Sequence, residues 1–107
     1  TEISGVVPPQ EIAANEFVLE ELYPNPFSQY VAIKLNLPET QFVLIRIYDS
    51  QGEEVRLISS NLGFRGENEF FWDGTDIYDN PVPNGVYLVR VTYKGNSEVR
   101  RVILQRD

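Results

Sequence analysis

Apolar and polar side chains alternate along most of this chain, which is the pattern of strands that are half buried. Every second residue is apolar from Val31 to Leu37, and the same period returns from Val43 to Ile47. No stretch shows the period of a helix. The strand-like segments lie near residues 17–23, 31–37, 43–47, 55–57, 68–72, 87–91 and 98–105. About seven strands without a helix predict an all-β fold, an antiparallel β-sandwich formed by one domain.

The stretch from Trp72 to Val91 is predicted to be the centre of this fold. Alternation places Trp72 on an apolar strand face before the loop, and it places Tyr87 and Val89 on another after it. We therefore expect two half-buried strands that form a hairpin-like pair. Turn residues fill the connection at 73–74, 79–81 and 83–85. The residues expected to form the structural core are Ile45, Ile47, Trp72 and Val89.

Two further connections carry turn signals. The run from Asp49 to Gly52 predicts a type I turn with Gly52 in the left-handed region. This turn would join a hairpin whose second arm holds Val55 and Leu57. Residues 61–66, which are rich in glycine, predict a break before the Trp72 strand.

Two prolines interrupt the first strand-like segment within the run YPNPF at residues 23–27. Pro24 has no N–H and so ends the pairing of that strand. Asn25 lies between the prolines, which favours an extended conformation, and Phe27 can then fold back as an apolar plug. The run predicts a rigid corner.

Four motifs together resemble a known family of bacterial Ig-like modules. They are YPNPF at 23–27, IYDSQG at 47–52, WDG at 72–74 and VPNGVY at 82–87. The last two resemble the second half of the FlgD-type Ig-like domain of the flagellar hook-capping protein and of C-terminal sorting domains of the type IX (Por) secretion system. The first two resemble the opening of those sorting domains. The resemblance covers nearly all of residues 17–104 and implies an Ig-like antiparallel β-sandwich.

The resemblance implies a non-catalytic sorting domain at 17–107, joined by a linker at 1–16 to a preceding cargo domain. The domain would direct a larger secreted protein of a Bacteroidetes-type bacterium through the periplasm and outer membrane to the cell surface or medium. The implied partners are the outer-membrane translocon and a sortase that cleaves in the linker and anchors the cargo to lipopolysaccharide. The implied sorting or partner-binding residues are Tyr23, Pro24, Asn25, Pro26, Phe27, Gly85, Tyr87, Arg100, Arg101 and Arg106. The alternative is a FlgD-like Ig module that serves assembly or spacing in a surface or secreted protein.

Composition narrows the possible chemistry. The chain has no Cys and no His, which excludes Ser-His-Asp and Cys-His catalysis, thiolate and imidazole metal sites, and disulfides. Carboxylate chemistry remains open, because paired Asp or Glu residues can do acid-base work or bind calcium in a cleft, but such clefts are rare in small sandwiches. We expect no enzyme activity and no cofactor. A net charge of -7 argues against a nucleic-acid partner. No stretch approaches the roughly 18 apolar residues that a membrane span requires.

Charge is distributed unevenly along the chain. Residues 1–16 contain Pro8-Pro9 and three acids but no base, which is typical of a linker. The end of the chain is basic, and two interpretations of this remain open: docking to a receptor, or the solvated polar face of an alternating strand. The basic residues in question are Arg90, Lys94, Arg100, Arg101 and Arg106.

Two other kinds of site remain as alternatives. Asp73, Asp76 and Asp79 could hold calcium, but they are spaced three apart and lack the spacing of an EF-hand. We expect them to accept turn N–H groups as caps, with Asp79 tolerating the left-handed region, and no metal site. Exposed tyrosines could form a sugar-binding face, although aromatic pairing across strands accounts for them equally well. These are Tyr23, Tyr30, Tyr48, Tyr78 and Tyr93.

Overall fold

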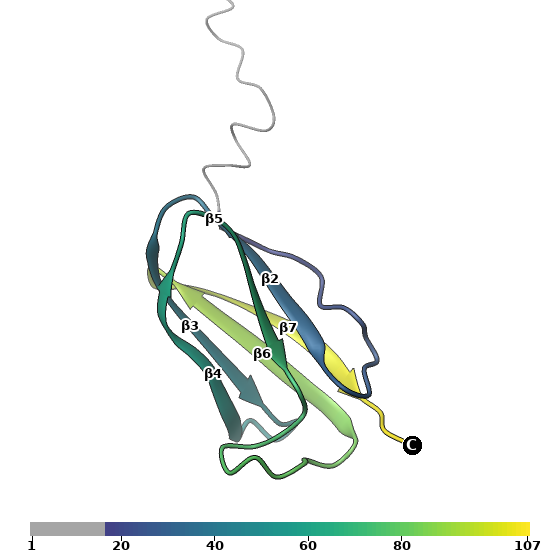
Figure 1. The fold of residues 1–107 in the computed structure, drawn as a ribbon. Helices are drawn as coiled ribbons and strands as arrows, with labels where there is room; N and C mark the ends of the chain where they lie inside the picture. Colours follow the sequence, from purple (N-terminus) through teal and green to yellow (C-terminus); the bar gives the residue numbers. More distant parts are fainter. Residues whose placement is uncertain (1–16) are drawn as a thin grey trace, which may run out of the picture.

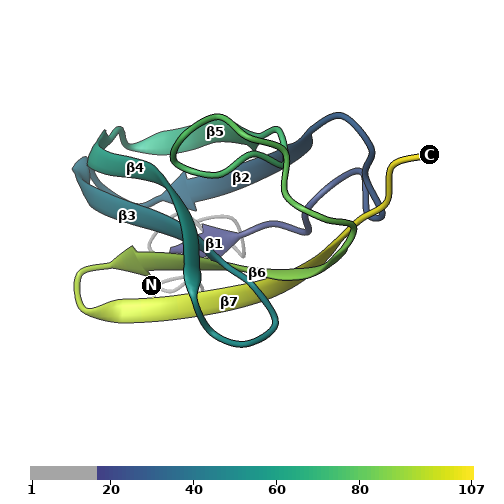
Figure 2. The same ribbon diagram turned by 90° about the horizontal axis from the view of Figure 1, so that it is seen from below.

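The computed structural model describes residues 17–107, and the expected linker at 1–16 lies outside the described residues. The strands are β1 (Val18–Leu19), β2 (Val31–Leu37), β3 (Gln41–Tyr48), β4 (Glu54–Gly63), β5 (Gly66–Trp72), β6 (Gly85–Tyr93) and β7 (Asn96–Leu104). They form two antiparallel sheets with the strand orders β1-β2-β5 and β4-β3-β6-β7 (Figure 1). In Figure 2, β2 and β5 lie above β6 and β7. The predicted all-β sandwich of about seven strands is confirmed.

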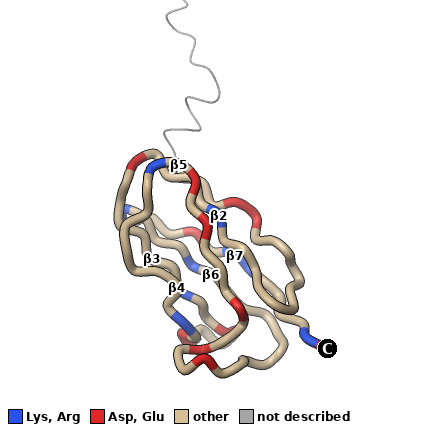
Figure 3. Tube along the Cα trace, viewed as in Figure 1, with Lys and Arg blue, Asp and Glu red and all other residues tan. Residues whose placement is uncertain are grey.

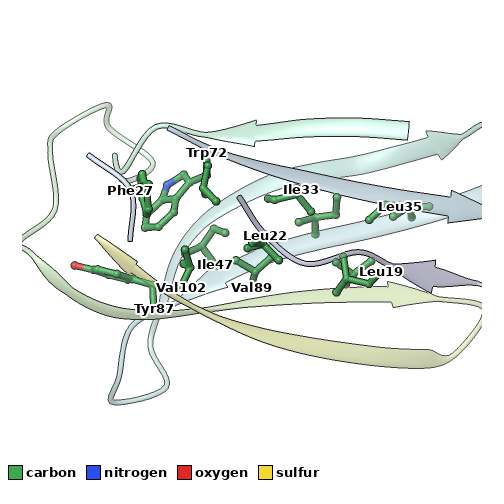
Figure 4. Close-up of a cluster of buried hydrophobic side chains, with 14 of the residues drawn as sticks. Leu19, Leu22, Phe27, Ile33, Leu35, Ile47, Trp72, Tyr87, Val89 and Val102 are labelled. Carbon is green, nitrogen blue, oxygen red and sulfur yellow. The ribbon is translucent and has the colours of Figure 1, made fainter. Parts of the chain in front are cut away.

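The core lies between the two sheets and is built from the inward half of each alternating strand. Ile45, Ile47 and Val89 are fully buried, and Trp72 is 1% exposed. Figure 4 shows Phe27, Trp72 and Tyr87 gathered at one end of the core, with Leu19 and Leu35 toward the other. No polar or charged side chain is buried among residues 17–107, so hydrophobic burial is the main stabilising term.

The expected hairpin-like pair around the Asp73–Asn84 connection is wrong. Strand β5 pairs with β2 in one sheet, whereas β6 pairs with β3 and β7 in the other. The connection therefore crosses between the sheets at one end of the sandwich. Alternation identifies the buried face of a strand, but it says nothing about which strand lies beside it.

The turn from Asp49 to Gly52 joins β3 and β4 as expected, with Gly52 at φ +87°. The Asp49 carboxylate accepts the N–H groups of Gln51 and Glu53, each at 2.9 Å. This capped turn fixes the start of β4.

Strand β4 differs from the sequence prediction in two respects. Its pairing with β3 contains register shifts, so that Leu57 faces solvent and Ile58 packs against the core instead. Such β-bulges move the inward face by one residue, which an alternation pattern does not reveal. The expected break at 61–66 is also mostly strand, because β4 continues to Gly63. A Cβ atom at Gly63 would collide with Leu37 and Val43, so this glycine allows the strand to pass close to the core.

Candidate functional site

The corner at residues 23–27 connects the two sheets. Its Tyr23 carbonyl accepts the N–H of Ala32 in β2 at 2.9 Å. Four residues later, the Phe27 N–H donates to the carbonyl of Ile103, and the Phe27 carbonyl accepts the N–H of Gln105 at 2.8 Å. The corner therefore begins on the three-stranded sheet and ends paired with the last part of β7.

The side chain of Asn25 adds a second connection to the same strand. Its amide Nδ2 donates to the carbonyl of Arg101 at 3.1 Å, and its Oδ1 accepts the N–H of Ile103 at 2.9 Å. A side-chain amide offers the same donor and acceptor as a peptide group, so Asn25 occupies the place of a neighbouring strand residue. Pro24 and Pro26, whose peptide bonds are both cis, flank it.

Phe27 is the apolar anchor of the corner. It is 2% exposed, and its ring lies 5.4 Å from that of Trp72 between centroids. Trp72 in turn lies edge-on to Tyr87 at 5.1 Å (Figure 4). Aromatic pairs in such tilted arrangements are favourable beyond the area that they bury. The three rings join the corner, β5 and β6 at one end of the core.

Tyr87 is polar only at its tip. Its hydroxyl donates to the carbonyl of Pro83 at 2.6 Å. Burial raises the pKa of this hydroxyl, the negative charge of Asp49 raises it further, and Arg106 acts in the opposite direction. Gly85, at the start of the same strand, pairs with Leu104. Both residues thus hold the loop before β6 against the end of the chain.

Arg106 ties the Asp73–Asn84 loop to the C-terminal end. Its guanidinium donates to the carbonyls of Val82 at 2.8 Å and Gly74 at 2.9 Å, with a longer contact of 3.3 Å to the carbonyl of Asp73. The Asn84 side chain both donates to the Arg106 carbonyl and accepts its N–H. Gly74 adopts φ +76°, a conformation that favours glycine, and a Cβ there would also displace the guanidinium.

The three C-terminal arginines do not form one basic cluster. Arg100 lies in line with the inward residues of β7, donates to the carbonyl of Leu19 at 2.9 Å and pairs with Glu98 at 3.0 Å. Arg106 is bound by the loop. Arg101 points outward from the sheet, is exposed, and makes no ion pair or side-chain hydrogen bond within residues 17–107. Of the three, only Arg101 presents its charge to a partner without breaking an internal contact.

The acidic loop is held by turn contacts. The Asp76 carboxylate accepts the N–H groups of Tyr78 and Asn80, at 2.9 and 3.0 Å, as an Asx cap. Asp79 adopts φ +65° and pairs with Arg56 at 2.9 Å. In the part of the chain that the structure describes, no group of three or more metal-ligating side chains lies together.

The five tyrosines considered for a sugar-binding face do not share one surface. Tyr93 is buried, whereas Tyr78 is exposed in the crossing loop. Tyr30 is half exposed and lies edge-on to Phe71 at 5.6 Å on the three-stranded sheet, whereas Tyr48 lies on the other sheet. Tyr23 and Tyr30 line one pocket together with Phe71, so two tyrosines of the set share a surface and the five do not form a single platform.

Two anchors of this region are absent from the sequence prediction: Asn84 and Arg56. Arg56 donates to the Thr75 hydroxyl and the Asp76 carbonyl, at 2.7 and 2.6 Å, in addition to its Asp79 contact. The sequence pattern marks Asn84 only as a turn residue. Its likeness to Asn25, an asparagine beside a proline, is the signal that could have identified it as a second amide contact on the chain end.

Most of the chain resembles one family of known domains. A family model described as the FlgD Ig-like domain matches residues 27–97. A comparison with curated proteins found no significant match. No helix among the described residues has the length and apolar character that a membrane span needs.

Three solved structures share the fold. Dimeric latent PorU from Porphyromonas gingivalis is 23% identical with a TM-score of 0.63, covering 96% of this chain and 10% of that chain. PorZ of the same bacterium, described as an essential surface component of the type IX secretion system, is 25% identical with a TM-score of 0.55 over 82% of this chain and 11% of its own. FlgD from P. aeruginosa is 23% identical, with a TM-score of 0.56. The match covers 84% of this chain and 74% of the FlgD chain. The chain thus spans only about a tenth of the PorU and PorZ chains.

Proposed function

Because the chain belongs to the family of FlgD Ig-like domains, we propose that it is the non-catalytic sorting and anchoring domain of a larger secreted protein. In this proposal the domain directs its cargo through a type IX secretion system to the cell surface or the medium. One observation carries this proposal. The family match covers residues 27–97, and it is flanked by residues 17–26 and by the end of β7. These two flanking segments are hydrogen-bonded to each other through Asn25.

The comparisons support this choice between the two kinds of relative. The likeness to PorU covers 96% of this chain and so includes most of the flanking segments, and PorZ belongs to the type IX system. The partners in this proposal are the outer-membrane translocon, a sortase that cleaves within 1–16, and a preceding cargo domain. The absence of His and Cys supports a role without catalysis or a cofactor.

Within the proposed site, the residues divide into those that shape it and those that a partner can reach. Phe27 and Tyr87 are buried, and Arg100 and Arg106 are engaged in internal hydrogen bonds. Tyr23 is 76% exposed beside the two prolines. We assign direct contact with the translocon to the exposed residues of the corner and to Arg101, and a shaping role to the rest.

A fusion experiment tests the proposal. A fluorescent passenger with a signal peptide and residues 1–107 is expressed in a bacterium that has a type IX system, and fluorescence is measured in the medium, at the surface and in the periplasm. We expect the fusion to leave the periplasm, while the passenger without the domain stays there. An intact, folded fusion that remains periplasmic in a host exporting its own cargo would refute the sorting role.

The role of charge is tested separately from folding. Arg101→Gln removes an exposed charge and leaves the contacts of Arg100 and Arg106 in place. Lys34→Gln, on the opposite sheet, is the matched control for loss of one exposed cation. We expect export to fall with Arg101→Gln, with an unchanged melting temperature, and to be unaffected by Lys34→Gln.

A second candidate function is a FlgD-like module that serves assembly or spacing. The likeness to P. aeruginosa FlgD, which covers 74% of that chain, favours it. Two results would support this second function. The fusion would remain in the periplasm, and the domain would fold equally well when it is placed inside a chain as when it is placed at the end.

A further inference from the structure

The outer face of the four-stranded sheet differs in charge from the molecule as a whole. The chain carries a net charge of -7. Alternation and register place three arginines on this face, Arg46, Arg90 and Arg101, against a single strand acid, Glu54. Much of the remaining face is apolar and open to solvent. Its exposed apolar residues are Phe42, Leu57, Leu62, Val86 and Val99.

The outer face of the three-stranded sheet has the opposite character. Strand β5 presents Glu67 and Glu69 there, opposite Asn36 and Lys34 of β2, and Lys34 pairs with Glu69 at 3.9 Å. Figure 3 shows red segments along β5. The negative charge of the chain therefore does not extend over the face that carries the arginines.

Arg46 and Arg90 are directly opposite each other in neighbouring central strands. Like charges at such a position are unfavourable for the isolated sheet. Arg46 has one acidic neighbour, with Glu54 Oε1 at 3.4 Å from its Nε, whereas Arg90 makes no ion pair within residues 17–107. Arg101 pairs with Leu88, two residues from Arg90 in β6, and so lies diagonal to Arg90 on the same face. The three cations thus cross β3, β6 and β7, with a diagonal step between Arg90 and Arg101.

A hollow of about 290 Å³ lies at the two opposed arginines. The side chains of Leu44, Tyr48, Thr92 and Ser97 line it together with Arg46 and Arg90. A guanidinium binds a carboxylate through two parallel hydrogen bonds. A carboxylate placed here would offset the repulsion between the two cations.

We infer that the outer face of the four-stranded sheet binds a partner protein through an acidic segment that also carries apolar side chains. A carboxylate of the segment lies between Arg46 and Arg90, a second reaches Arg101, and apolar side chains cover Val99 and Leu57. This inference does not require the proposed sorting function, because Arg46 and Arg90 carry it; Arg101 is shared with the surface that we assign above to the translocon.

Charge also decides between the possible occupants. A second copy that pairs through the same face would place arginines against arginines, and each copy carries a net charge of -7. Nucleic acid and anionic membranes select denser basic clusters than three arginines on an acidic domain. An acidic and partly apolar protein segment suits both the sparse cations and the apolar surface between them.

The test uses the purified chain of residues 1–107 and a fluorescein-labelled short peptide in which Glu alternates with Leu and Thr. Its partner peptide has Gln in place of every Glu. Binding is measured by fluorescence anisotropy at low and moderate salt, and the site is mapped by amide chemical shifts. We expect the Glu peptide to bind at least about tenfold more tightly than the Gln peptide, with salt weakening it. Shifts should centre on Arg46, Arg90 and Arg101.

The variant pair Arg46→Gln and Arg90→Gln, combined in one protein, should lose this binding by about tenfold or more while its melting temperature stays the same or rises. Lys34→Gln, on the other sheet, should bind as the natural chain does. Equal binding of the two peptides, no binding of the Glu peptide, or shifts on the three-stranded sheet would overturn the inference. So would self-association that the double variant abolishes, or binding to vesicles of anionic lipid without binding to the peptide.

Discussion

The YPNPF corner and the Asp73–Asn84 loop are the two irregular segments at one end of this sandwich, and both hold the end of the chain by different means. The corner uses backbone pairing between Phe27 and β7, a buried ring, and the amide of Asn25. The loop uses polar side chains: Arg106 donates to its carbonyls, and Arg56 reaches its far side. The corner thus behaves as an extra piece of sheet, whereas the loop is a capped turn system held by cations.

The difference indicates where a change in sequence should matter. Apolar anchors are shared by both segments, because Phe27 and Trp72 are in contact at their junction. Polar contacts are local to one segment each. Removing an anchor should therefore disturb both regions, whereas removing a cap should disturb only one.

The largest effect is expected from Trp72→Ala or Phe27→Ala. Loss of a large buried aromatic costs about 3–5 kcal/mol, a large share of the roughly 5–15 kcal/mol that stabilises such a domain. Each variant should therefore be close to unfolding, as urea denaturation would measure. Urea midpoints equal to that of the natural chain would show that the two rings do not anchor both segments.

The double variant sharpens this prediction. Because the two rings are in contact, the combined loss should be smaller than the sum of the two by about 0.5–3 kcal/mol. Additive losses in the free energy of unfolding would show that the corner and the loop are not coupled through these rings. If the double variant is fully unfolded, the cycle can be repeated with Phe27→Leu and Trp72→Phe.

The asparagine contacts come next. Asn25→Ala and Asn84→Ala each remove two exposed hydrogen bonds, so each should lower the free energy of unfolding by about 1–2 kcal/mol. Amide exchange distinguishes them: the first should accelerate exchange at Ile103 and the second at Arg106. Acceleration of both amides by either variant would contradict the separation of the two segments.

A smaller effect is expected from Asp76→Ala, which removes the Asx cap of the loop. The cost should be about 1 kcal/mol, because two turn N–H groups lose the carboxylate and must bond to water instead. The free energy of unfolding, measured by urea denaturation, checks this value.

Millimolar calcium should not change the melting temperature of the natural chain. A domain that bound calcium only when folded would gain about 2.7 kcal/mol at one hundred times its dissociation constant. A rise that Asp76→Ala abolishes would therefore establish a calcium site.

The smallest effect is expected from Tyr87→Phe, and it depends on pH. The folded state raises the pKa of this hydroxyl above its ordinary value of 10.0, mainly through burial. The folded state therefore holds the proton more tightly, and the resulting stability is complete below about pH 10 and is lost as the pH rises further. Tyr87→Phe should reduce this alkaline loss and cost about 0.5–1 kcal/mol at neutral pH for the bond to Pro83.

Denaturant titrations of both proteins at neutral and alkaline pH measure this difference. Lys94, whose pKa is raised by its hydrogen bond to Glu39, titrates in the same range but is present in both proteins, so its contribution cancels. Identical pH dependence of the two would contradict the assignment to Tyr87.

The alternation of the sequence predicted the buried faces of β2, β3, β6 and β7, because a period of two follows directly from strand geometry. It did not predict strand neighbours, since β5 and β6 are consecutive in the chain yet lie in different sheets. The alternation pattern also did not predict the bulges of β4. One extra residue moves Ile58 inward, and nothing in the composition of the segment marks it.

The candidate site was predictable in its parts and not in its assembly. The proline pair marked the corner, and the plug position of Phe27 followed from its apolar character. The contact of Asn25 with β7 spans 76 residues of sequence and depends on the closed sandwich. Alternation separates the faces of Arg100 and Arg101, but the bond of Arg100 to the backbone of β1 depends in the same way on the closed sandwich.

Export by matched variants tests the central claim, which is that the corner and the last strand form the unit that a type IX system reads. The passenger fusion with residues 1–107 is compared with its Asn25→Ala and Asp76→Ala versions, which disturb the corner and the loop respectively and are expected to cost about 1–2 and about 1 kcal/mol in stability. We expect Asn25→Ala to lower export strongly while the protein remains folded, and Asp76→Ala to be exported as the natural domain is. Equal export of the two variants would contradict it.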